Sequence, residues 1–76
     1  MSEAATAGGT SPPYMANQIA RFFESQGDHA TAVAGAAQHI KDFWTPSMRR
    51  ALIAMVDADQ APDLSPIARD AILSLR

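Results

Sequence analysis

Two histidines, His29 and His39, are the side chains of this chain best suited to acid–base chemistry or metal binding near neutral pH. Their separation of ten positions is about 15 Å along a continuous helix and places them on different faces, too far apart to share a metal ion. Asp42 follows His39 by three positions, a spacing that favours a surface pair or simple partial burial over an acid–base role. Several hydroxyls lie beside prolines, where they commonly satisfy backbone groups: Ser11, Thr45 and Ser65. The sequence therefore predicts no catalytic, cofactor-binding or metal site in this chain.

The chemistry of recognition is concentrated at the corner formed by residues 43–50, which holds the only tryptophan. Thr45 is a good helix N-cap and Pro46 is suited to the first helical position, so we expect a helix to begin at Pro46. Arg49 and Arg50 then lie near the positive end of the helix dipole, where acidic residues are favoured. Two positive charges at this end of the helix are electrostatically unfavourable. Their presence is consistent with guanidinium groups that bind something outside the helix.

Two neighbouring pairs of residues leave alternatives open. Asn17 and Gln18 either cap their helix or face water, or they donate to and accept from the backbone of a partner. Phe43 and Trp44 are first read as core residues, but both together exceed what so small a domain hides comfortably. Because tryptophan and arginine are enriched among interface hot spots, our hypothesis is that this aromatic corner inserts into a groove on a larger protein. The methionines are read as core filler.

Length and composition point to dependence on another chain. With 76 residues the chain can form one domain at most, and domains of this size bury only about 60% of the surface that the unfolded chain exposes. The absence of cysteine excludes disulfides and thiolate metal sites. Six basic residues against eight acidic ones give a net charge of −2, which disfavours generic nucleic-acid binding. No apolar run is long enough to span a bilayer, so a cytoplasmic protein without membrane contact is expected.

The periodicity of apolar residues predicts an all-α fold, a small bundle of three to four short helices. Residues 1–13 have no apolar period and are expected to form a flexible, disordered N-terminal tail, and residues 14–76 to form a single helical domain. The first helix is expected to run from Tyr14 to near Gly27, and the second to start after Asp28 as its cap. A third helix from residue 46 to about residue 58, and a short fourth helix after a Ser-Pro pair at residues 65–66, complete the prediction.

Two segments of the chain resemble a known family. The run Met-Ala-Asn-Gln-Ile-Ala at residues 15–20 is followed by Phe-Phe, and His-Ile at residues 39–40 leads into Phe-Trp-Thr-Pro-Ser-Met-Arg at residues 43–49. Their sequence, order and spacing resemble the small delta subunit of NAD-dependent, molybdenum-containing formate dehydrogenases, from Tyr14 to Leu52. The last third of the chain is compatible with that family but adds little weight, and the tail matches nothing in particular.

The resemblance implies a non-catalytic accessory chain of a cytoplasmic hetero-oligomer, with no cofactor of its own. By resemblance, other subunits hold the molybdenum cofactor, the iron–sulfur clusters, FMN and the NAD site, and this chain binds the large molybdenum-containing subunit to support its assembly, stability or cofactor insertion. The residues expected to bind that partner are Met15, Asn17, Gln18, His39, Phe43, Trp44, Pro46, Met48 and Arg49. The alternative is a free-standing helical regulator that binds nucleic acid through the helix start at Arg49 and Arg50, with Lys41.

Overall fold

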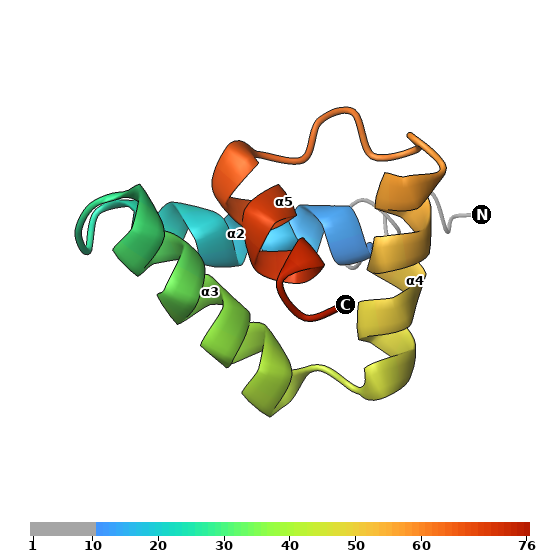
Figure 1. The fold of residues 1–76 in the computed structure, drawn as a ribbon, viewed down its shortest axis with the longest axis horizontal. Helices are drawn as coiled ribbons and strands as arrows, with labels where there is room; N and C mark the ends of the chain where they lie inside the picture. Colours follow the sequence, from blue (N-terminus) through green and yellow to red (C-terminus); the bar gives the residue numbers. More distant parts are fainter. Residues whose placement is uncertain (1–10) are drawn as a thin grey trace.

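A computed structural model describes residues 11–76, which form four α-helices (Figure 1). They are α2 (Pro12–Glu24), α3 (His29–Phe43), α4 (Pro46–Asp57) and α5 (Pro66–Leu73). In Figure 1 the short α5 lies in front of α2, and a tight connection at the lower end of the view joins α3 to α4. Since α2 packs against α3 and both pack against α5, the helices share one core. The predicted all-α class is confirmed.

Each helix begins at a capping side chain that the sequence supplies. The side-chain oxygens of four N-cap residues accept hydrogen bonds from the backbone N–H three positions later, at 2.9 to 3.4 Å: Ser11, Asp28, Thr45 and Ser65. A proline follows the cap in α2, α4 and α5, where the missing N–H costs nothing. The N–H of Thr31, hydrogen-bonded to the carboxylate of Asp28, lowers the pKa of that carboxyl from its usual value. The caps expected for the last three helices are confirmed.

Both ends of the first helix differ from the prediction. Ser11 caps α2 and the helix includes Pro12 and Pro13, so these three residues belong to the helical domain and not to the tail. The rest of the predicted tail lies outside the described residues. At the other end α2 stops at Glu24, before Gly27, and the hydroxyl of Ser25 donates to the carbonyl of Phe22 at 3.2 Å. A local side-chain bond that competes with the helical ladder is a physical reason for the early stop.

The core is built largely from alanine. Its buried members with small side chains come from α2, α3 and α5 and from the loop before α5: Ala16, Ala20, Ala36, Ala61, Ala68 and Ala71. Small side chains let helix backbones approach closely, which compensates for the small number of large buried residues. The largest fully buried side chains are Ile40, Leu52 and Ile72, one each from α3, α4 and α5.

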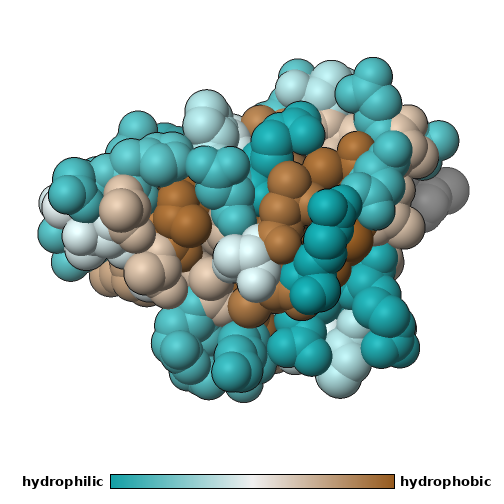
Figure 2. All heavy atoms as spheres, in the orientation of Figure 1, coloured by the Kyte–Doolittle hydropathy of each residue, from teal (hydrophilic) through white to brown (hydrophobic). Residues whose placement is uncertain are grey.

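Figure 2 shows a further apolar region on the side of the molecule where α5 lies in front. Apolar atoms gather in a hollow between α4 and the C-terminal part of α5, and hydrophilic residues border them (Figure 2). The guanidinium of Arg76 donates to the carboxylate of Asp57 and so ties the chain end to the end of α4. Ile53 of α4 and Leu75 near the C-terminus are half-buried and pack against the core.

Asn17 holds the loop before α5 against α2. Its Nδ2 donates to the carbonyl of Asp63 at 3.0 Å, and its Oδ1 accepts from the backbone N–H of Ser65 at 2.9 Å. One amide therefore links two loop positions to a helix 46 to 48 residues away in sequence. This arrangement fixes the residue that caps α5.

We expect Asn17→Ala to lower the free energy of unfolding by about 1–2 kcal/mol, because the half-buried N–H of Ser65 loses its acceptor. Gln18→Ala, at the exposed neighbouring position, is the control and should change stability by less than about 0.5 kcal/mol. Urea unfolding measures both values. Amide hydrogen exchange in residues 61–65 should also become faster in the Asn17 variant alone, and unchanged exchange there would contradict this role for Asn17.

Candidate partner-binding surface

Three large aromatic side chains of α2 and α3 are exposed to solvent. Tyr14 is 46% exposed, Phe22 is 63% exposed and Phe43 is 73% exposed. In contrast, the amphipathic pattern of a helix normally directs such residues inward. Exposed aromatic residues that lie close together mark interaction surfaces more often than scattered ones do.

These side chains border two adjoining depressions, which together we name the α2–α3 groove. The first has a volume of about 460 Å³ and is lined by Tyr14, Met15, Gln18, Ile19, His39, Phe43, Trp44 and Met48. The second, of about 330 Å³, is lined by Gln18, Ile19, Phe22, Phe23 and His39. Because Gln18, Ile19 and His39 line both, the two depressions form one continuous surface.

A chain of aromatic contacts runs along the groove. Phe22 meets Phe23 edge-on with ring centroids 5.0 Å apart, Phe23 lies 6.3 Å from the ring of His39, and His39 lies 4.7 Å from Phe43. His39 is half-buried in this row. The carboxylate of Asp42, which the spacing had offered as its partner, instead accepts a hydrogen bond from Gln38 at 2.9 Å. The sequence left two structural roles for His39, a surface pair with Asp42 or partial burial. The structure supports partial burial.

The structure brings six of the nine residues expected to bind a partner to this groove: Met15, Gln18, His39, Phe43, Trp44 and Met48. Trp44, however, is only 6% exposed and belongs to the core cluster. The indole is packed within its own chain and does not project outward, so insertion of the aromatic corner into a larger protein stays a prediction. Phe43, its neighbour, projects from the surface and Trp44 forms part of the groove floor.

Three expected residues do not line the groove. Asn17 is committed to its own chain through the two hydrogen bonds to the loop before α5, which argues against a bond to a partner's backbone. Pro46 is exposed at the start of α4, and Arg49 is half-buried one turn further on. Arg49 makes no salt bridge within residues 11–76, so its pairing with a partner stays a prediction.

Sequence reasoning missed part of the groove. Tyr14, Ile19, Phe22 and Phe23 line the groove, but none of them was among the residues expected to bind a partner. Consecutive residues differ by 100° on a helix, so Phe22 and Phe23 cannot face the same way, and Phe22 is exposed while Phe23 is half-buried. The adjacent Phe-Phe pair was the available signal of an apolar surface wider than the core requires.

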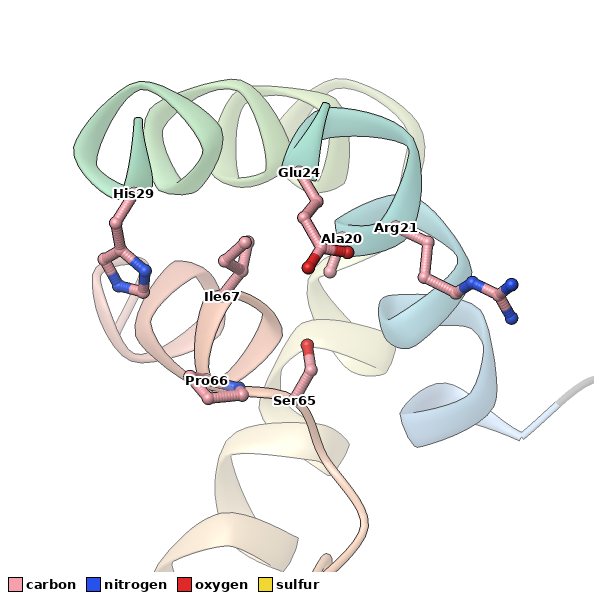
Figure 3. A pocket seen from close by; sticks show the side chains of 7 residues that line it. All are labelled: Ala20, Arg21, Glu24, His29, Ser65, Pro66 and Ile67. Carbon is pink, nitrogen blue, oxygen red and sulfur yellow. The ribbon is translucent and has the colours of Figure 1, made fainter. Parts of the chain in front are cut away.

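A separate pocket, of about 210 Å³, is lined by residues of α2, by His29 at the start of α3, and by the start of α5 with its cap Ser65 (Figure 3). Glu24 and Ser65 point toward one another across it, whereas Arg21 points away (Figure 3). The Nε2 atom of His29 in α3 lies 2.8 Å from a carboxylate oxygen of Asp70 in α5. The two residues are far apart in sequence, and the sequence did not reveal this pair.

A serine and a histidine line this pocket, and the histidine is paired with Asp70, which raises the question of nucleophilic catalysis. The Nε2 atom of His29 is occupied by Asp70, and the Ser65 oxygen accepts the N–H of Ala68 as a helix cap. No hydrogen bond joins Ser65 to His29, and both members of the histidine pair are more than half exposed. A nucleophile needs a base within hydrogen-bond reach, so this pocket lacks the essential contact. Within residues 11–76 no group of acidic residues and histidines is arranged to hold a metal ion.

Gly35 of α3 fits closely against the ring of Phe23 in the groove wall. A Cβ atom at Gly35 would lie 2.5 Å from Cδ1 and 2.7 Å from Cε1 of Phe23. Such distances are shorter than any real contact, so the ring must move if a side chain is added. The glycine therefore sets the position of the Phe23 ring, which packs against it.

We expect Gly35→Ala to destabilise the chain by about 1 kcal/mol, because the strain of overpacking exceeds the gain in helix propensity. Gly27→Ala is the control, since its Cβ would meet Thr31 at a milder 3.1 Å. Thermal unfolding gives the stability, and the NMR signals of the Phe23 ring report its displacement. Unshifted ring signals in the Gly35 variant would contradict the expected displacement.

No helix among the described residues is long and apolar enough to cross a membrane. The fold and the groove define a small all-α chain whose exposed aromatic surface is typical of a subunit of a larger assembly. The sequence model of the NADH-dependent formate dehydrogenase delta subunit FdsD matches residues 14–72, and the chain belongs to this family. Comparison with curated proteins and with solved structures found no match. The resemblance seen in two segments is thus confirmed, and the match continues beyond them to residue 72.

Proposed function

We propose that this chain is a non-catalytic accessory subunit of a cytoplasmic NAD-dependent formate dehydrogenase. In this proposal it binds the large molybdenum-carrying subunit through the α2–α3 groove and supports that subunit's assembly, stability or cofactor insertion. The observation that carries the proposal is the groove itself, with three exposed aromatic residues on a chain of the delta subunit family.

The energetics of the groove favour a permanent partner. Full burial of one phenylalanine side chain contributes about 1.5–3 kcal/mol, and Phe22 and Phe43 both have most of their surface left to bury. The half-buried residues between them add to the area that a partner would remove from water. A small domain that leaves this apolar area in water gains stability when another chain covers it.

The division of labour between subunits follows from the same proposal. The chain has no cysteine for iron–sulfur ligation, and the pocket with Ser65 and His29 lacks the contact that activates a nucleophile. We therefore assign the molybdenum cofactor, the iron–sulfur clusters, FMN and the NAD site to other subunits of the complex. The role of this chain is then binding, and no step of formate oxidation is assigned to it.

The proposal is tested by producing the whole complex with and without this chain. With an affinity tag on this chain, we expect the molybdenum-carrying subunit to copurify in a fixed ratio that survives gel filtration. Without the chain, that subunit should carry less molybdenum or lose activity faster on warming. The isolated chain should show no turnover of formate and NAD. Equal molybdenum content and heat resistance in both preparations would overturn the accessory role.

A further inference from the structure

We propose that the α2–α3 groove receives a single amphipathic helix of the partner subunit, which places two large apolar side chains, one helical turn apart, in its two depressions. This inference rests on the proposed function and specifies what occupies the surface. It also predicts a polar residue on the partner helix between the two apolar ones.

The spacing of the depressions carries the inference. Along α2, one depression is lined by Tyr14 and Met15 and the other by Phe22 and Phe23, and both share Ile19 midway. Tyr14 and Phe22 are eight positions apart, which is about 12 Å along the helix axis. The centres of the depressions are therefore offset by about one turn, close to 6 Å. This is the distance between residues i and i+4 on a helix, the spacing by which helices dock into grooves.

The chemistry of the lining excludes charged occupants. None of the residues that line either depression is Asp, Glu, Lys or Arg. A charged peptide would lose its hydration without gaining a partner, which costs several kcal/mol for each buried ion. Nucleic acid and anionic lipid surfaces would likewise find no cation here. An apolar helix face complements the groove best.

Two polar side chains lie at the divide between the depressions. Gln18 of α2 and His39 of α3 line both depressions and belong to the same surface. Once covered, the carboxamide of Gln18 and a ring nitrogen of His39 need hydrogen-bond partners, because an unpaired buried polar group costs about 1–3 kcal/mol. A polar residue of the bound helix at this point would satisfy them and fix the register of docking.

The test uses photocrosslinking in the complete complex. Tyr14 and Phe22 are replaced in turn by benzoylphenylalanine, a photoreactive aromatic residue, in the chain assembled with its partner subunits. Both positions are exposed aromatic sites at opposite ends of the groove. Lys41, exposed on α3 and outside the groove lining, is the control site. Mass spectrometry then locates each adduct.

We expect both sites to crosslink to one segment of the molybdenum-carrying subunit, at positions about eight residues apart, with apolar residues at helical spacing between them. The Lys41 site should give at most trace adducts there. Adducts on two distant segments, or on a second copy of this chain, would overturn the inference. So would an intact complex without adducts from either groove site. A single helical segment on a different subunit would support the docking mode and overturn only the choice of subunit in the proposed function.

Discussion

Phe43→Asp is expected to weaken binding of the partner subunit by about 30- to 1000-fold, which corresponds to about 2–4 kcal/mol. Phe43 is the most exposed of the large apolar residues and forms one edge of the larger depression. A carboxylate at this position would be forced out of water against an apolar surface that offers it no cation. The dissociation constant, measured by titration calorimetry with the purified molybdenum-carrying subunit, checks this prediction.

Ala34→Asp is the matched control for this prediction. It introduces the same charge on an exposed position of the same helix, away from the residues that line the groove. A carboxylate at the C-terminal end of α3 costs only about 0.3–1 kcal/mol of folding stability, so the Phe43 variant should remain folded, as circular dichroism would verify. If both variants bind with similar affinity, the groove is not the interface.

The helix starts were the most predictable part of this fold. Asp28, Thr45 and Ser65 accept hydrogen bonds from a backbone N–H three positions later. Each helix start is therefore determined by a few adjacent residues. The same holds for the prolines that follow two of these caps. Where an interaction is local in sequence, propensity and capping rules are sufficient to predict it.

The errors concern interactions between distant segments. Asn17 was offered to a partner because its true acceptor and donor lie 46 and 48 residues away, in a loop with no sequence signal. The choice between Phe43 and Trp44 depended on which of two adjacent side chains faces the core, and the tight turn into α4 directs the indole inward. Such outcomes depend on helix packing angles that periodicity alone does not supply.

Only part of the groove could be predicted from the sequence. Gln18 and Phe43 were identified from their residue types and positions, Met15 belongs to a segment shared with a known family, and the three do lie together. Phe22 and Tyr14 were missed as surface residues, since an apolar residue in an amphipathic helix is assigned to the core by default. An excess of aromatic residues over what an alanine-rich core can bury is the physical sign of such a surface.

Leu52→Ala is expected to lower the free energy of unfolding by about 2–5 kcal/mol. Leu52 is fully buried and is the only buried residue of α4, so its truncation leaves a cavity that α4 alone cannot fill. A single core of this size rarely supplies more than about 3–5 kcal/mol in total. The isolated variant should therefore be largely unfolded at 25 °C, as thermal and urea unfolding would show. Phe43→Ala, which removes a larger but exposed side chain, should change stability by less than about 0.5 kcal/mol.

With the partner subunit present, the less stable variant, Leu52→Ala, should keep its binding surface, whereas the stable variant, Phe43→Ala, should bind weakly. A partner that binds only the folded chain adds about 4 kcal/mol of stability at a thousandfold excess over its dissociation constant. Leu52→Ala should therefore regain helical structure on binding, with its affinity lowered by the cost of folding, because its groove residues are intact. Phe43→Ala should stay folded alone and bind weakly. Retention of both variants at equal affinity would mean that neither the core nor the groove limits assembly, and the partner would then have to contact a surface other than the α2–α3 groove.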